Sequence, residues 1–253
     1  MNFSKTFLSA CFGIVAIGAC AANPQVIAHR GYWKTDGSAQ NSIRSLVKAD
    51  SIGCYGSEFD VWATADGAIV VNHDATINGI TIQTSPASIV MPQGLHNGET
   101  ISTLQKYLDT AKGLKTRIIL EMKEHADKAK EEQVVKDIVA LIAARGLEDR
   151  TEYITFSKEG LFNFIKYAPK GTPVFYLSGD MTPAELKAAG AAGLDYSIGA
   201  MRKHPEWFKQ AHDLGLKVNV WTVNKEGDMK WCIEKGADFI TTNEPELLQS
   251  ILK

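Results

Sequence analysis

Cysteine is scarce in this sequence, and the patterns in which it usually builds metal sites or disulfide frameworks are missing. Only 4 of the 253 residues are cysteine, and no C-x-x-C or H-E-x-x-H motif occurs. Nothing therefore supports a zinc site. Beyond the N-terminal segment only Cys54 and Cys232 remain, without motif spacing. A bond between them stays open for a protein in an oxidising compartment, but two buried free thiols are the better interpretation.

Concentrated positive charge is also absent. The sequence has no block of lysine and arginine residues, and its formal net charge is -2. Neither nucleic acid nor an anionic membrane surface is therefore expected as the main partner, because both require a positive patch. A small anionic substrate remains compatible, since a few cations in a pocket suffice to bind it. Low-complexity tracts are lacking too, and 253 residues with 45% hydrophobic content predict one large domain.

A long apolar run occurs only near the N-terminus. Residues 1–22 combine a charged start at Lys5, an apolar run over 7–19 and small residues around Cys20, which is typical of an export signal. The run is shorter than the roughly 20 residues of a membrane span. Residues 17–20 resemble a bacterial lipobox, which implies a lipid anchor at Cys20, and cleavage to a soluble product is the alternative. We expect an exported protein of the periplasm or envelope, with its folded domain over 23–253.

From residue 25 onward, short β-branched runs alternate with helical periodicity, the pattern of βα units around a parallel sheet. Eight barrel strands are expected near 25–29, 57–61, 117–122, 151–156, 173–177, 194–198, 217–223 and 238–242. Helices are expected between them over 42–52, 103–111, 127–144, 158–167, 182–189, 205–214, 225–234 and 245–252. Eight strands, each followed by a helix, predict an α/β protein of the TIM (β/α)8 barrel class.

A ninth strand-like run over 69–72 follows the second barrel strand too closely for a parallel crossover. We expect it to form an antiparallel hairpin with that strand. If Asp66 and Gly67 are a two-residue loop, Asp60 lies directly opposite His73, with their Cβ atoms about 5 Å apart. The hairpin then brings a histidine to a carboxylate. With the segment that follows, it is expected to form a small insertion over about 65–98 at the barrel mouth.

Three carboxylates are placed so that they converge in this barrel. Glu58 and Asp60 are two residues apart on one strand and share a face, and Glu121 lies on the next barrel strand. Two carboxylates about 4 Å apart repel by roughly 4 kcal/mol at an effective dielectric of 20, so the cluster requires a cation or protons. Oxygen ligands favour Mg²⁺, Ca²⁺ or Mn²⁺. The alternative is that these acids only form salt bridges with Arg30 and Lys123.

Two histidines accompany the acids at strand ends, namely His29 and His73. Because their ordinary pKa is near 6.5, one can accept a proton from a nucleophile while the other donates one to a leaving group. Arg30 and Lys123 suit phosphate oxygens, and Trp221 ends the seventh strand, where substrate contacts gather in this fold. Taken alone, each histidine is more often structural, and Trp221 equally suits the core or rim. The other histidines are expected to be surface residues: His96, His125, His204 and His212.

Together these motifs resemble the glycerophosphodiester phosphodiesterase family, because they occur in its order along essentially the whole chain after residue 25. They are H-R-G at 29–31, E-F-D-V-x-x-T-x-D-G-x-x-V-V-x-H-D at 58–74, L-E-M-K at 120–123, V-W-T-V-N at 220–224 and G-A-D-F-I-T-T-N-E-P at 236–245. The resemblance implies a TIM barrel with a small insertion after its second strand. It also implies one divalent cation, Mg²⁺ or Ca²⁺, and hydrolysis of glycerophosphodiesters to glycerol 3-phosphate and an alcohol.

The resemblance further implies a role for each site residue. Glu58, Asp60 and Glu121 match the metal ligands, and His29 and His73 match the acid/base pair. Arg30 and Lys123 match the phosphate contacts, and Trp221 matches the contact with the glycerol side of the substrate. One histidine would deprotonate the adjacent glycerol hydroxyl for attack on phosphorus and the other would protonate the departing alcohol. A cyclic phosphate would form and be opened by water.

One position departs from the family pattern. Where the family usually has E-N-T after the first strand, this chain has Gln40, Asn41 and Ser42. The change removes one negative charge near the site, so metal affinity and metal choice stay open. The ligand candidates at 58, 60 and 121 are intact, and we expect an active enzyme.

Two other functions compete with this interpretation. A phospholipase of the C or D type, acting on intact lipid, requires an apolar lip, and the insertion contains candidates that equally suit a packed lid: Ile80, Ile82, Ile89, Val90 and Met91. A non-catalytic envelope lipoprotein that binds a phosphorylated ligand has no need of a proton donor and acceptor, so the two histidines argue against it.

Overall fold

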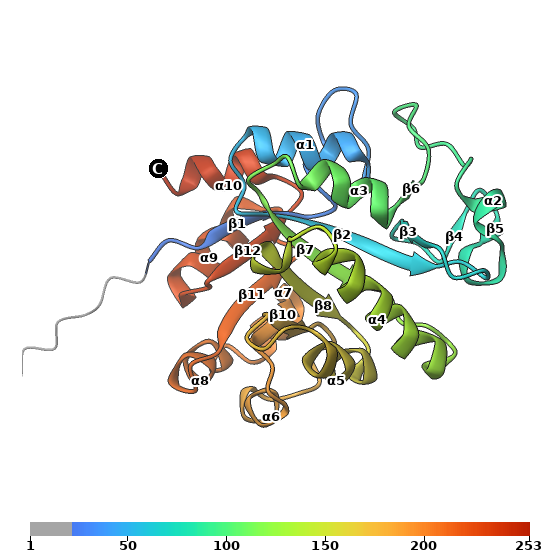
Figure 1. Cartoon of the computed structure of the whole chain (residues 1–253). Helices are drawn as coiled ribbons and strands as arrows, with labels where there is room; N and C mark the ends of the chain where they lie inside the picture. The colour runs from blue at the N-terminus through green and yellow to red at the C-terminus, as the bar shows by residue number, and fades with distance from the viewer. Residues whose placement is uncertain (1–21) are drawn as a thin grey trace, which may run out of the picture.

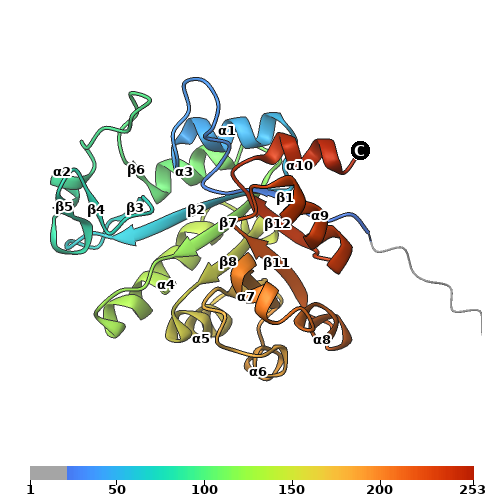
Figure 2. The ribbon, with the colours of Figure 1, turned by 180° about the vertical axis from the view of Figure 1, so that it is seen from behind.

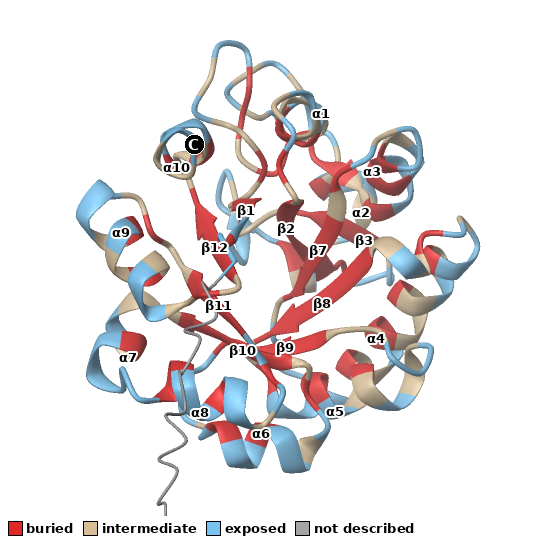
Figure 3. Ribbon diagram, turned by 90° about the vertical axis from the view of Figure 1, so that its left-hand side faces the viewer, coloured by how far each residue is buried: buried red, intermediate tan, exposed pale blue. Residues whose placement is uncertain are grey.

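The computed structural model describes residues 22–253, so the predicted signal segment and Cys20 lie outside the described residues. Eight parallel strands pair side by side, and β1 pairs with both β2 and β12, which closes the barrel seen end-on in Figure 3. The strands are β1 (Gln25–Ala28), β2 (Gly56–Ala63), β7 (Arg117–Met122), β8 (Thr151–Thr155), β9 (Val174–Tyr176), β10 (Gly193–Ser197), β11 (Lys217–Trp221) and β12 (Phe239–Thr242). The predicted TIM barrel is confirmed.

All the predicted helices are present around this barrel (Figure 1), and their ends differ from the predictions by only a few residues. They are α1 (Ile43–Ser51), α3 (Leu104–Ala111), α4 (Lys128–Ala143), α5 (Lys158–Tyr167), α6 (Pro183–Ala189), α8 (Trp207–Asp213), α9 (Glu226–Lys235) and α10 (Pro245–Ile251). A further short helix, α7 (Ile198–Lys203), was not predicted, because fewer than two turns give no readable periodicity. Within residues 22–253, no helix has the length and apolar character needed to cross a membrane.

Between β2 and α3 the chain leaves the barrel and forms an excursion at the end toward which β2 points (Figures 1 and 2). Its elements are β3 (Ile69–Val71), β4 (Thr76–Ile77), β5 (Ile80–Thr81), a 3₁₀ turn (Ile82–Thr84), α2 (Ala87–Val90) and β6 (Ser102–Thr103). A separate small core holds it together, formed by Trp62, Val70, Ile82, Val90 and Ile101. The excursion thus covers one side of the barrel mouth.

The hairpin that starts this excursion is antiparallel as predicted, but its predicted register is wrong. Val61 pairs with Val71 and Ala63 pairs with Ile69. Asp60 therefore lies opposite Asn72, whose N–H donates to the Asp60 carbonyl at 3.0 Å, and not opposite His73. The reason is the loop, which has three residues and ends on Gly67 at φ +85°, a common alternative to the two-residue turn. One extra loop residue shifts every cross-strand pair by one.

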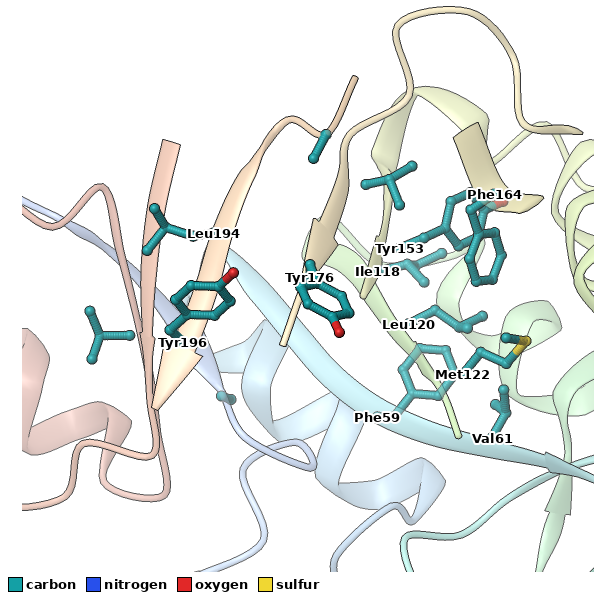
Figure 4. Close-up of a cluster of buried hydrophobic side chains, with 14 of the residues drawn as sticks. Phe59, Val61, Ile118, Leu120, Met122, Tyr153, Phe164, Tyr176, Leu194 and Tyr196 are labelled. Carbon is teal, nitrogen blue, oxygen red and sulfur yellow. The ribbon is translucent and has the colours of Figure 1, made fainter. Parts of the chain in front are cut away.

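Alternation along the strands separates an outer core from the barrel interior. Outward-facing residues such as Phe59, Leu120 and Tyr153 pack beneath the helices (Figure 4), and Tyr153 stacks on Phe164 of α5 at 4.3 Å between ring centroids. A second cluster fills the interior: Ile27, Ile119, Ile154, Phe175, Leu177 and Phe239. Because Phe59 faces outward, the residues on either side of it, Glu58 and Asp60, face inward. Both described cysteines are buried free thiols, as expected.

The close approach of β10 to β11 makes Gly193 the most sterically restricted glycine of the sheet. A Cβ atom on Gly193 would lie 2.0 Å from the backbone oxygen of Lys217, its register partner. We expect Gly193→Ala to lower the free energy of unfolding by about 3 kcal/mol or more, measured by urea denaturation. Gly227→Ala, in α9 with nothing within 4 Å of the new Cβ, is the matched control and is expected to be neutral or slightly stabilising. Equal unfolding curves for the two variants would contradict this steric argument.

Candidate active site

The predicted site residues meet at the ends of β1, β2, β7 and β11, where the excursion also delivers His73. A cavity of about 430 Å³, counted to its open mouth, is lined by His29, Arg30, Glu58, His73, Glu121, Lys123 and Trp221. Asp60 lies directly behind this lining, where it contacts Lys123 and Arg30. The structure therefore brings all eight predicted site residues together at the carboxyl ends of the barrel strands, the usual location of active sites in this fold.

The three carboxylates form a buried acidic cluster. Glu58, Asp60 and Glu121 are 2%, 1% and 7% exposed, and each offers an oxygen within 4.8 Å of the others. The cluster follows from the barrel register, in which Asp60 pairs with Glu121 across β2 and β7. Among the described residues, Glu58 Oε1, Asp60 Oδ1 and Glu121 Oε1 have no hydrogen-bond partner. A buried all-oxygen donor set, in which Glu58 Oε1 has no partner within residues 22–253 and the other two oxygens contact only the Lys123 ammonium, fits a hard divalent cation.

Lys123 partly neutralises this cluster. Its Nζ lies 2.7 Å from Asp60 Oδ1 and 2.5 Å from Glu121 Oε1, as ion pairs rather than well-directed hydrogen bonds. Burial is the largest single influence and would raise the pKa of Asp60, but the charges of Lys123 and His73, together with hydrogen bonds from Lys123 and Asn41, outweigh burial and lower it. Burial and the charge of Asp60 raise the pKa of Glu121 to about 8 and that of Glu58 well above its usual range. One lysine is therefore not enough to keep all three acids ionised.

A tight turn after β1 holds Arg30 beside the acids. Arg30 and Gly31 have φ of +58° and +74°, and a Cβ on Gly31 would lie 2.4 Å from Ser45 Oγ in α1, so only glycine fits there. The Arg30 N–H donates to Glu58 Oε2 at 2.8 Å, and its Nη1 donates to Gln40 Oε1 at 2.7 Å. Gln40, which stands where the family usually has glutamate, therefore contacts the Arg30 guanidinium. The acidic cluster of Glu58, Asp60 and Glu121 forms without a carboxylate at position 40.

Each histidine is oriented by a hydrogen bond at Nδ1. His29 Nδ1 lies 2.8 Å from Asn243 Oδ1, an acceptor that also receives the indole N–H of Trp33. His73 Nδ1 lies 2.7 Å from Asp74 Oδ1. Because both partners are acceptors, the Nδ1 atoms carry protons, which leaves both Nε2 atoms for the cavity. Burial, followed by the charge of Arg30, lowers the pKa of His29 to about 4, and burial lowers that of His73.

Two asparagines act in this site that the sequence analysis did not single out. Asn41, at φ +59°, donates from Nδ2 to Asp60 Oδ2 at 2.8 Å and accepts the Asp60 N–H at 3.1 Å. Asn243 orients His29, as described above. Both belong to motifs that the sequence analysis quoted, and asparagine tolerates the left-handed conformation at position 41. The presence of asparagine at position 41 is therefore the one sequence signal that could have indicated a left-handed backbone conformation there.

The prediction that His125 is a surface residue is wrong. Its side chain is fully buried, with Nε2 accepting the Ala63 N–H at 3.0 Å and Nδ1 donating to the Lys123 carbonyl at 2.8 Å. Its backbone N–H donates to the buried Glu131. A polar loop residue usually faces water, but this loop folds back beneath the excursion and the imidazole supports the backbone of Lys123. The other three predicted surface histidines are exposed: His96, His204 and His212.

The opposite wall of the cavity is mainly apolar. Trp221 meets Phe156 edge-on, with ring centroids 5.6 Å apart, and Ile154 and Leu177 add to the wall. The Trp221 indole N–H donates to the backbone oxygen of Asp195 at 2.8 Å, which fixes the ring. The cavity therefore joins a charged half, able to hold a phosphate and move protons, to an apolar half, able to hold a short carbon chain.

Comparison with known proteins identifies relatives over nearly the whole chain. The model of the glycerophosphoryl diester phosphodiesterase family matches residues 29–247. The crystal structure of a glycerophosphodiester phosphodiesterase from Parabacteroides distasonis is 46% identical, with a TM-score of 0.89 over 91% of this chain and 97% of that chain. A glycerophosphodiester phosphodiesterase from Caldanaerobacter subterraneus subsp. tengcongensis is 28% identical over 249 residues, which is 90% of this chain and 97% of the relative.

The same barrel occurs in a more distant protein. A phosphodiesterase from Oleispira antarctica, solved in complex with the product sn-glycerol-3-phosphate, has a TM-score of 0.77 at 21% identity. The match covers 90% of this chain and 96% of that chain. At this identity the likeness concerns the fold.

Proposed function

The chain belongs to the glycerophosphoryl diester phosphodiesterase family, and we propose that it hydrolyses glycerophosphodiesters to glycerol 3-phosphate and an alcohol. The observation that carries this proposal is the pair of imidazoles, His29 and His73, whose Nδ1 atoms are both engaged and whose Nε2 atoms are left for one cavity. A pocket that only bound a phosphate would gain nothing from two such groups. Proton transfer at both ends of a phosphodiester requires them.

We propose that Glu58, Asp60 and Glu121 hold one divalent cation, Mg²⁺ or Ca²⁺. The Glu58 Oε1 atom, unpartnered within the described part of the chain, and the mutual repulsion of the three acids support this assignment, because a cation satisfies both. When bound, the ion supplies positive charge that offsets the charge of the phosphodiester. Asn41 keeps Asp60 in place by two hydrogen bonds, and Lys123 adds a fixed positive charge beside it.

Each side chain of the cavity then has a separate role in the reaction. Arg30 and Lys123 bind phosphate oxygens, the first as a planar donor and the second as a point charge. One histidine takes the proton of the glycerol hydroxyl next to the phosphate, and that oxygen forms a bond to phosphorus. The other histidine protonates the oxygen of the departing alcohol as its bond to phosphorus breaks. Water opens the cyclic phosphate with the two roles reversed, and Trp221 packs against the glycerol carbons throughout.

The burial of most apolar side chains in the excursion favours water-soluble substrates over intact lipids. Of its apolar residues, Ile82 and Val90 are fully buried and only Ile89 is 50% exposed. The buried residues make a packed cover over the barrel mouth rather than an apolar lip that enters a bilayer. Export to the envelope, with a lipid anchor at Cys20, is a separate proposal from the sequence, since that residue lies outside the described residues.

A panel assay tests the proposed function. Release of glycerol 3-phosphate is measured from the choline, ethanolamine and glycerol diesters of glycerol 3-phosphate, and release of choline or phosphocholine is measured from vesicles of intact phosphatidylcholine. We expect turnover of the soluble diesters with little release from vesicles, because the cavity admits a short polar arm. Hydrolysis of the vesicles alone would favour a phospholipase. Binding of the diesters without any turnover, with either cation present, would favour a non-catalytic binding protein.

A further inference from the structure

Asp195 is a buried carboxyl group in the same cavity to which the proposed chemistry assigns no part. It lies on β10, where its register partner is Asn219 on β11, and it is 2% exposed. It lines the cavity, and its Oδ1 has no hydrogen-bond partner among the described residues. It belongs to the apolar half, away from the acidic cluster of Glu58, Asp60 and Glu121.

A buried carboxyl oxygen without a hydrogen-bond partner is costly, so Oδ1 of Asp195 calls for an occupant. The neighbouring polar groups are largely engaged with one another. Asn219 and Thr241 exchange hydrogen bonds of 2.8 and 3.2 Å with each other, and the Trp221 indole N–H bonds the backbone oxygen of Asp195 rather than its side chain. Burial raises the pKa of Asp195 to about 8, with a partial offset from Asn219, so near neutral pH the group can donate as well as accept.

The charged half and the apolar half of the cavity together determine which part of a ligand can reach Asp195. Arg30 and Lys123 define the phosphate end, and Trp221, which would pack on the carbon chain, donates its indole N–H to the backbone oxygen of Asp195. At the other end, Asp195 lies among the apolar side chains of Trp221, Ile154 and Leu177, a lining that suits a short carbon arm ending in a polar group.

We propose that Asp195 is a specificity-determining residue that hydrogen-bonds the terminal hydroxyl of the substrate's glycerol arm. This inference rests on the proposed function and adds the subsite that selects the substrate. An arm whose terminal oxygen carries an acyl group can no longer donate a hydrogen bond to Asp195. The subsite therefore selects fully deacylated glycerophosphodiesters against their monoacyl precursors.

The test compares two diesters of choline phosphate. One carries glycerol, and the other carries a 2-hydroxypropyl arm, which keeps the hydroxyl next to the phosphate and lacks only the terminal one. We expect the wild-type kcat/KM to favour the glycerol arm by about 10- to 100-fold. Asp195→Leu, which keeps the volume of the side chain without its polar atoms, is expected to lose that preference through a lower kcat/KM for the glycerol diester.

Asp195→Ala is measured in parallel, because it removes the same oxygens without adding bulk if the leucine variant does not fold. Asp195→Asn is the conservative control and is expected to keep most of the preference, since an amide both donates and accepts. Titration calorimetry of glycerol 3-phosphate against 2-hydroxypropyl phosphate gives a second readout without turnover, with the same expected ratio. A wild-type enzyme that hydrolyses both diesters equally, or Asp195 variants that slow both alike, would overturn the subsite. Absence of any hydrolysis would instead overturn the proposed function.

Discussion

Replacement of His29 or His73 by alanine is expected to lower kcat by about 10²- to 10⁴-fold for each variant, the usual range for loss of a general acid or base. Both imidazoles have Nδ1 engaged, on Asn243 and on Asp74, so each has only Nε2 with which to exchange a proton with substrate. If one histidine accepts the first proton and the other delivers the second, neither can replace its partner. KM is expected to change far less than kcat, because phosphate binding is assigned to Arg30 and Lys123.

The double variant is a further check on the division of roles. Residues that act in one proton sequence are strongly non-additive, so the double variant is expected to be only slightly slower than the slower single variant. His204→Ala is the matched control, since this residue is exposed on another part of the barrel, and it is expected to keep wild-type turnover. Full activity of either His29→Ala or His73→Ala, in a variant with an unchanged circular dichroism spectrum, would remove the acid/base assignment.

Removal of divalent cations is the second change expected to have a large effect. Chelation is expected to abolish turnover, and Mg²⁺ or Ca²⁺, added back separately, is expected to restore it. A stability measurement gives an answer independent of turnover. An ion that binds only the folded state adds about 2.7 kcal/mol at one hundred times its dissociation constant, so the melting temperature is expected to rise with its concentration.

Glu58→Gln separates cation binding from general stability. Glu58 is 2% exposed, and its pKa is raised by burial and by the charges of Asp60 and Glu121. A neutral amide relieves that repulsion, so the variant without cation is expected to melt at or above the wild-type temperature. It is also expected to lose both activity and the stabilisation by added cation. Glu124→Gln changes an exposed acid and is expected to respond to cation as the wild type does.

The opposite pattern would contradict the assignment of the ion site. If Glu58→Gln were stabilised by the cation as strongly as the wild type, the ion would bind elsewhere. If chelation left turnover unchanged, Lys123 alone would neutralise the acids, through its contacts with Asp60 and Glu121. Both measurements use the same protein samples, so a failure of catalysis can be distinguished from a failure of binding.

Most of the architecture was predictable because it depends on local patterns. The boundary at Thr182 is an example, since the threonine and Glu185 form the capping box that their spacing indicates. Alternation along β2 placed Glu58 and Asp60 on the inner face without any knowledge of the neighbouring strands. Helix α7 and the register of the hairpin were not predictable in this way, because one depends on a few residues and the other on whether Gly67 closes a two- or three-residue loop.

The sequence predicted the charged and titratable side chains of the site, but not the residues that hold those side chains in place. Glu121 and Lys123 stand in a motif that carries their chemistry, whereas the role of His125 depends on a loop that folds under the excursion and buries an imidazole against the Lys123 carbonyl. Asn41 and Asn243 act through hydrogen bonds to residues 19 and 214 positions away. Such pairs are invisible in local patterns because the distance along the chain carries no information about the distance in space.

By itself, the sequence determined that a parallel barrel forms and that acids, imidazoles and cations end its strands, because side-chain alternation and helical periodicity act over a few residues. Only the tertiary structure decided which of these groups meet, how each imidazole is turned, and that Asp195 is buried in the cavity with an unpartnered oxygen. The physical reason is closure of the barrel. Until β1 pairs with both β2 and β12, no local preference brings residues from opposite ends of the chain into one cavity.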